Sequence, residues 1–175
     1  MKSITMPSCI LLSFLFACTH IDIFIQDGRL STKPKRILIG SFEKRSLEFV
    51  PFISNNFRDA LGFEFFKRGY RVDLLVITED NTTGIGTFKL EKAQITELNL
   101  KHSSDLFIQG ALSERSYVDS IETETSTLIT LQLYNRNGDK IGEGRYISSE
   151  TLSNAMTITN IASIIVDKLD SRLSE

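Results

Sequence analysis

The fold is decided by the stretch RILIGSF at residues 36–42 and by the segment that follows it. This short, largely apolar run is bounded by turn-forming and charged residues, as is typical of a β-strand covered on both faces. A helix is predicted next, from about Leu47 or Pro51 to Arg68, and a second strand from Tyr70 to Ile77. A strand, a helix and a strand in this order require a parallel pair of strands.

The predicted helix carries one apolar stripe, because apolar residues recur at spacings of three and four: Val50, Ile53, Phe57, Leu61 and Phe65. Pro51 suits a first helical turn, and Gly69 suits the left-handed position just past the helix end. Three further aromatic residues, Phe52, Phe63 and Phe66, widen the stripe. Such crowding fits either a partner-binding ridge or packing on a sheet, and packing is the favoured interpretation.

The rest of the chain predicts a weak helix, three strands and a last helix: Leu90–Lys101, Asp105–Leu112, Thr125–Tyr134, Lys140–Ile147 and Ser153–Leu173. Gly110 inside a strand indicates close approach of another group or a bulge. A strong turn signal at 135–139 makes the last two strands a hairpin. Ser153 is expected to cap the last helix.

The fold class is therefore α/β (α+β), in the order β-α-β-α-β-β-β-α. We expect a five-stranded mixed sheet with helices packed on it, in a single domain over residues 36–175. Apolar residues make up 41% of the chain and charged residues 24%, as in soluble globular proteins. The formal net charge of −2 argues against nucleic acid as the main partner.

Residues 1–17 have the pattern of a signal peptide, with Lys2 at the start and a nearly unbroken apolar run from Cys9 to Phe16. The small residue Ala17 then precedes Cys18, an arrangement that resembles the lipobox of bacterial lipoproteins. This resemblance implies that Cys18 is lipidated and becomes the mature amino terminus. The alternatives are a simply secreted protein and an uncleaved anchor.

Residues 18–35 are interpreted as a lipidated tether, in which the alternation from His20 to Ile25 also suits a short edge strand. Cleavage would remove Cys9 and lipidation would consume Cys18, the two cysteines of the chain. The mature domain would then depend on its core without a disulfide. No later stretch reaches the roughly 18 to 20 apolar residues that span a bilayer.

Several strings carry a resemblance to a known superfamily: Arg36–Phe42, Arg68–Tyr70, Ser104–Gly110, Leu131–Tyr134, Asn137-Gly138 and Ile141–Gly144. Together they resemble the curli-secretion lipoprotein (CsgG) superfamily, which includes lipoprotein activators of penicillin-binding proteins and the TolB amino-terminal domain. The resemblance implies a domain that faces the periplasm from a lipid anchor. No pair of long alternating segments is left over for a membrane barrel, so a pore is not expected.

The chemistry-bearing residues predict no catalytic site, cofactor site or metal site. His20 and His102 lack metal-ligand spacing, and the glycines at 84 and 86 with Lys89 lack the remainder of a phosphate-loop motif. Carboxylates near basic residues are interpreted as solvated ion pairs; they are Glu43, Glu48, Asp59 and Glu64. A second acidic group is expected in a solvated connection between two strands; it comprises Glu114, Asp119, Glu122 and Glu124.

These features predict a non-enzymatic bacterial envelope lipoprotein. Its domain would bind another envelope protein as an assembly factor or regulator, with the membrane contacted through lipidated Cys18 and no small-molecule substrate. Thr19 after the cysteine favours the outer membrane with a periplasmic domain. The alternatives are an outward-facing surface lipoprotein that binds an external ligand, a secretion-complex accessory without a barrel, and an enzyme whose site the sequence does not reveal.

Overall fold

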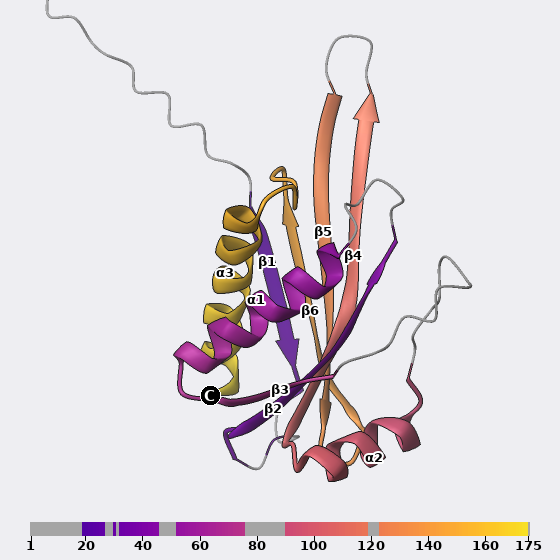
Figure 1. The fold of residues 1–175 in the computed structure, drawn as a ribbon, viewed down its shortest axis with the longest axis vertical. Coiled ribbons are helices and arrows are strands. Elements are labelled where there is room, and N and C mark those ends of the chain that lie inside the picture. Colours follow the sequence, from indigo (N-terminus) through magenta and orange to yellow (C-terminus); the bar gives the residue numbers. More distant parts are fainter. Residues whose placement is uncertain are drawn as a thin grey trace, which may run out of the picture.

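The computed structural model describes residues 19–26, 30, 32–45, 52–75, 90–118 and 123–174. Within these ranges six strands form one mixed sheet, in the order β1-β6-β5-β4-β2-β3, with three helices packed on it (Figure 1). The predicted α/β fold class and mixed sheet are confirmed. The sheet holds one strand more than the five that were expected.

The elements follow the predicted order after the added first strand. The strands are β1 (His20–Ile25), β2 (Arg36–Lys44), β3 (Arg71–Leu74), β4 (Leu106–Val118), β5 (Thr123–Asn135) and β6 (Lys140–Ser148). The helices are α1 (Ile53–Lys67), α2 (Lys92–His102) and α3 (Ala155–Leu173). Strands β4 and β5 are longer than predicted, with 13 residues each.

The first half of the chain forms the predicted parallel pair. β2 lies beside β3 from the Arg36–Arg71 pair to the Ile39–Leu74 pair, and α1 connects the two strands. β2 is also parallel to β4, whereas β4, β5 and β6 form an antiparallel meander. The loop with the glycines at 84 and 86 lies outside the described residues.

The added strand β1 is the edge strand that the alternation from His20 to Ile25 allowed. It pairs antiparallel with β6 along its whole length, and Ile23 is buried in the main core. The sheet therefore begins inside the segment that was interpreted as a tether. Cys18 and the predicted signal peptide lie outside the described residues. Within the part that the structure describes, no helix is long and apolar enough to cross a bilayer.

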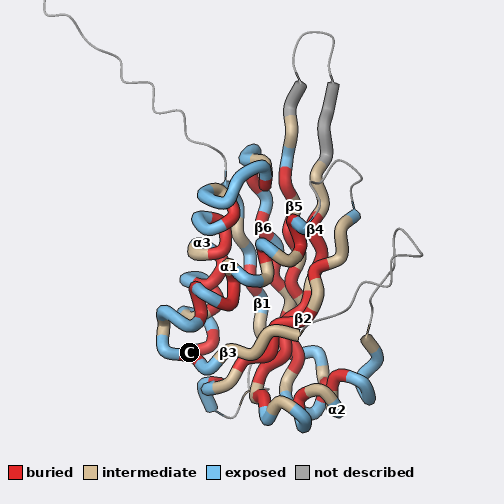
Figure 2. The backbone as a smooth tube through the Cα atoms, in the orientation of Figure 1, coloured by how far each residue is buried: buried red, intermediate tan, exposed pale blue. Residues whose placement is uncertain are grey.

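The two faces of the sheet are covered by different helices. α1 and α3 pack together against one face, where the main core includes Ile39, Leu131 and Ile165, each at most 1% exposed. On the other face α2 buries a smaller cluster in which Ile95 packs with Leu38. Figure 2 shows the buried parts of α1 and α3 turned toward the strands. The face that α1 and α3 cover is thus the larger source of stability.

Three local predictions can be compared with the backbone. A Cβ atom on Gly110 would lie 2.0 Å from the backbone oxygen of Thr130, so the predicted close approach is confirmed. Gly69 has φ +86°, the left-handed conformation expected just past α1. The predicted cap of α3 is wrong by one residue, because the side chain of Asn154 rather than Ser153 accepts a hydrogen bond from a backbone nitrogen of the first turn.

Candidate protein-binding surface

The inner side of α1 is the apolar stripe that the sequence predicted. Phe57, Leu61 and Phe65 have no exposed surface. Phe57 packs edge-on against Phe42 of β2 with ring centroids 5.0 Å apart, and Phe65 packs in the same way on Tyr70 at 5.4 Å. The contact with Phe42 holds α1 against the sheet, and the contact with Tyr70 joins the helix to the residue before β3. Leu47 and Pro51, the two positions at which the helix was expected to begin, lie outside the described residues, as does Val50 of the stripe.

The outer side of α1 carries two exposed phenylalanines, and a third, Phe52, is the residue just before the helix, with φ 70°. Phe52 is 70% exposed, Phe63 59% and Phe66 67%. The interpretation of these residues as sheet packing is therefore wrong. At 3.6 residues per turn, positions 63 and 66 fall on the same side of the helix, away from Leu61. We call these three residues the aromatic ridge.

The aromatic ridge is unusual because an exposed phenylalanine side chain buries little apolar surface when the chain folds and so adds little to stability. Each such side chain leaves apolar surface in water, and its burial in a partner would contribute about 25 cal/mol per Å². Single exposed apolar residues are ordinary on protein surfaces, whereas contiguous apolar patches are typical of interaction sites. α1 thus carries apolar residues on both its inner and its outer side.

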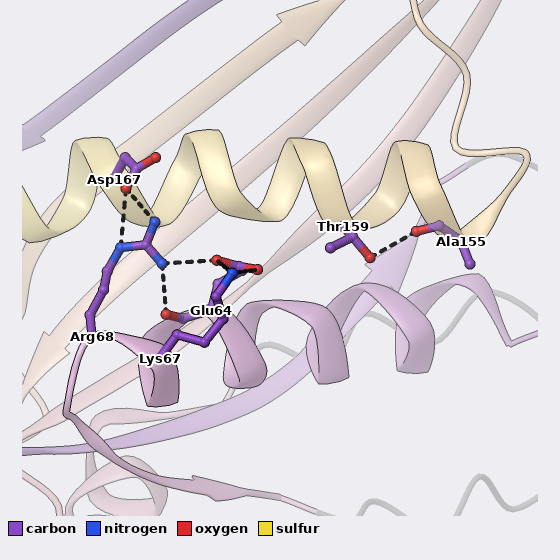
Figure 3. Close-up of polar contacts among 6 residues, drawn as sticks. All are labelled: Glu64, Lys67, Arg68, Ala155, Thr159 and Asp167. Atoms are coloured by element: carbon purple, nitrogen blue, oxygen red, sulfur yellow. Dashed lines mark hydrogen bonds and ion pairs between the residues drawn. The ribbon is translucent and has the colours of Figure 1, made fainter.

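Next to the ridge, α1 buries a carboxylate. The Glu64 side chain is 1% exposed, so its interpretation as a solvated ion pair is wrong. Lys67 Nζ donates to Glu64 Oε1 at 2.9 Å, and Arg68 Nη1 donates to Glu64 Oε2 at 2.9 Å. The Arg68 guanidinium also pairs with Asp167 of α3, as Figure 3 shows. Arg68 therefore joins the two helices through charged hydrogen bonds.

The charges of this network shift the pKa values of its members. Burial alone would raise the pKa of Glu64, but the hydrogen bonds from Lys67 and Arg68 outweigh it and hold that pKa below its usual range. Burial likewise works against the charged form of Arg68, yet its bonds to Asp167 and Glu64 raise its pKa. Glu64 and Arg68 are thus both charged at neutral pH.

The same network supports the ridge. Lys67 Nζ lies 5.6 Å from the ring centroid of Phe63, within the range of a cation–π interaction. Because Glu64 holds Lys67, the buried carboxylate helps to position an exposed aromatic ring. The ridge is therefore backed by a fixed polar network.

A second polar cluster lies where α1 ends. Tyr70 Oη donates to Asp170 Oδ1 of α3 at 2.5 Å, and Lys33 Nζ donates to the same oxygen at 2.7 Å. Burial and the bond to Asp170 raise the pKa of Tyr70 to about 12. The hydrogen bonds from Lys33 and Tyr70 lower the pKa of Asp170. This cluster fastens the segment between β1 and β2 to α3.

The other candidate residues named from the sequence, as far as the structure describes them, do not meet in one site. His20 is the first residue of β1 and His102 the last of α2, where its Nδ1 atom lies 3.8 Å from Asp73. Among the described residues, no group of three or more His, Cys, Asp or Glu side chains is arranged to hold a metal ion. Two of the other carboxylates form the ion pairs that were expected: Glu43 with Arg45 and Asp59 with Arg58.

The predicted acidic connection is placed differently. Glu114 lies within β4 and Glu124 within β5, so these two belong to strands rather than to a loop. Asp119 and Glu122 lie outside the described residues, as does Glu48. Sequence reasoning missed the longer strands because this Ser- and Thr-rich stretch lacks the apolar alternation that usually indicates a strand.

Comparison with known proteins gives a likeness of fold. No protein-family model matches the chain, and no curated protein matches it. Among solved structures, it is similar to the PelC dodecamer from Paraburkholderia phytofirmans, with a TM-score of 0.59 and 12% identity over 87% of this chain and 97% of that chain. A weaker likeness is to the LpoB C-terminal domain from Salmonella enterica, with a TM-score of 0.47 and 12% identity over 71% and 88%.

The superfamily that the sequence resembles, with its curli-secretion, penicillin-binding-protein activator and TolB groups, stays a prediction. At 12% identity the likeness concerns the fold, and we transfer no residue role to this chain.

Proposed function

We propose that this chain is a non-enzymatic envelope lipoprotein, anchored through lipidated Cys18, whose domain binds another envelope protein as an assembly factor or regulator. The aromatic ridge of α1 is the observation that carries the protein-binding part. Phe63 and Phe66 are at least 59% exposed on one helix face, with Phe52 exposed just before the helix, and aromatic side chains of this kind anchor protein interfaces.

The ridge suits a partner with an apolar groove and a carboxylate at its rim. Phe63 and Phe66 lie one turn apart, so one groove can take both rings. Lys67 beside them is 52% exposed and offers a cation. Aromatic residues are enriched at the centre of protein interfaces, and charged groups belong to the rim.

Site-specific photocrosslinking tests this surface in intact cells. A photoreactive residue at Asn56, an exposed position on the ridge side of α1, is expected to give a discrete protein adduct. Introducing Phe63→Ser and Phe66→Ser into the same chain should remove that adduct. The matched control carries the photoreactive residue at Met156, an apolar position of α3 that is 75% exposed. Adducts that persist in the ridge variant, or equal adducts from Met156, would contradict the assignment.

The anchor is tested separately. Replacing Cys18 with Ala should abolish labelling by a fatty-acid analogue and release the domain into the soluble fraction. Protease treatment of intact cells distinguishes a periplasmic domain, which is spared, from an outward-facing surface lipoprotein, which is degraded. These results decide the location independently of the ridge.

Self-association is a second candidate, as expected of a secretion-complex accessory. It is favoured by the likeness of fold to PelC, which forms a dodecamer. Light scattering of the purified chain separates the two candidates. A particle of many subunits that dissociates in the Phe63→Ser and Phe66→Ser variant would mean that the ridge binds a second copy of this chain, whereas a monomer would favour a different partner.

A further inference from the structure

The position of the predicted anchor follows from the register of the sheet. His20 is paired with Ile147, Ile147 with Leu128, and Leu128 with Ser113. These four residues form one row across β1, β6, β5 and β4. The described chain therefore begins at this row, with Thr19 next to His20.

Two strands continue past the row in the same direction. We call Glu114–Val118 and Thr123–Thr127, which pair with each other, the hairpin arm. Neighbouring strands end at or before its base, because the last pair of β2 joins Lys44 to Leu112 and the last pair of β6 joins Ser148 to Thr127. Figure 1 shows β4 and β5 projecting beyond the start of β1.

The hairpin arm extends farther past this row than Cys18 can reach. The β4 half of the arm lies past the row, and at about 3.3 Å per residue its length is roughly 17 Å. Cys18 precedes His20 by two positions and extends at most about 7 Å past the same row. The arm therefore stands roughly 10 Å farther out than the Cys18 Cα atom can reach.

We propose that the hairpin arm touches the headgroup layer of the membrane that holds Cys18, an inference that rests on the lipid anchor of the proposed function. Thr19 alone separates Cys18 from β1, so the sheet end is held close to the bilayer. An arm on the same end that reaches farther is placed to meet the same surface. The anchor and the arm together give two points of contact and fix the orientation of the domain.

The composition of the arm fits zwitterionic headgroups. It contains Ser116 and several threonines but no apolar run long enough to enter hydrocarbon. Tyr117 is of the residue type enriched at membrane–water interfaces. Glu114 and Glu124 against Arg115 make the arm slightly acidic, which disfavours an anionic lipid surface.

Tryptophan fluorescence tests the contact directly, because the chain contains no tryptophan. The acylated full-length protein carrying Tyr117→Trp is placed in phosphatidylcholine vesicles that contain a quencher either on the headgroup or deep on the acyl chain. We expect the headgroup quencher to reduce the indole emission at least twofold and the deep quencher to leave it nearly unchanged. Val118→Trp serves as a second arm variant should the first fold poorly.

The matched control is Leu100→Trp, at an exposed position of α2, where the headgroup quencher should have little effect. Equal quenching in the arm and control variants, or none in either arm variant of a protein whose acylation is verified by mass spectrometry, would overturn the arm contact and leave the anchor intact. Absence of any acyl group at Cys18 would overturn both the anchor and the arm contact. Neither result bears on partner binding by the aromatic ridge.

Discussion

α1 and α3 pack against the same face of one sheet but distribute their residues in different ways. α3 buries its apolar stripe, which includes Ile161 and Ile165, and begins with a side-chain cap from Asn154. α1 has no side-chain cap, buries Glu64 and exposes the aromatic ridge. α3 exposes Met156 and Ile164 but no aromatic residue, whereas α1 exposes two phenylalanines one turn apart.

The comparison shows that buried and exposed apolar residues need separate explanations. Buried apolar residues of both helices explain why the domain folds. The exposed phenylalanines of α1 have no such explanation, and the charged network beside them joins the end of α1 to α3. Variants of the two helices should therefore separate stability from binding.

The largest effects are expected from the buried sides, where the two helices should behave alike. Phe57→Ala in α1 and Ile165→Ala in α3 each remove a side chain with no exposed surface. Such truncations leave cavities, and we expect losses of about 4 and about 3 kcal/mol in the free energy of unfolding. Denaturant titration measures both. A loss below about 1 kcal/mol for either variant would contradict the packing described.

The next largest loss of stability is expected from the buried carboxylate of α1, which has no counterpart in the comparison with α3. Glu64→Gln removes a buried charge that accepts bonds from Lys67 and Arg68, and we expect a loss of about 2 kcal/mol at neutral pH, measured by denaturant titration. An unchanged free energy of unfolding would show that the network does not stabilise the packing of α1 on α3. Asp167→Asn, at an exposed position of α3, is the milder control.

The pH dependence has a defined sign. Because the folded-state pKa of Glu64 lies below its ordinary value of 4.5, its stabilising contribution is complete above that value and is lost as the pH falls through the folded-state pKa. Asp170, with its lowered pKa, acts in the same direction. The wild-type protein should therefore lose more stability than Glu64→Gln between neutral pH and about pH 3. Parallel curves from thermal melts would contradict the pKa direction.

A smaller effect is expected at the start of α3. Asn154→Ala removes the cap on the Thr157 backbone nitrogen and should cost about 1 kcal/mol in the free energy of unfolding. Ser153→Ala, at the neighbouring position that the sequence favoured, should change the same quantity by only a few tenths of a kcal/mol. Equal losses of stability in the two variants would contradict the assignment of the cap to Asn154.

Sequence patterns predict the strands, the inner stripe of α1 and the stripe of α3, because each depends on local periodicity. They also hold a signal for the aromatic ridge, since Phe63 and Phe66 fall opposite Leu61 at helical spacing. The burial of Glu64 could not be predicted, because its partner Arg68 is fixed by a residue of α3 that lies 99 positions away in the sequence. The sequence also left open whether residues 20–25 form a strand, because β1 pairs with β6, which lies far away in the sequence.

The central claim is that the outer side of α1 serves binding and not stability. The most direct test measures both properties in one variant that carries Phe63→Ser and Phe66→Ser, with Met156→Ser as the exposed apolar control on α3. We predict that the free energy of unfolding changes by less than about 0.5 kcal/mol in either protein, and that the Asn56 photocrosslink disappears only in the α1 variant. A large loss of stability with the crosslink retained would contradict the account.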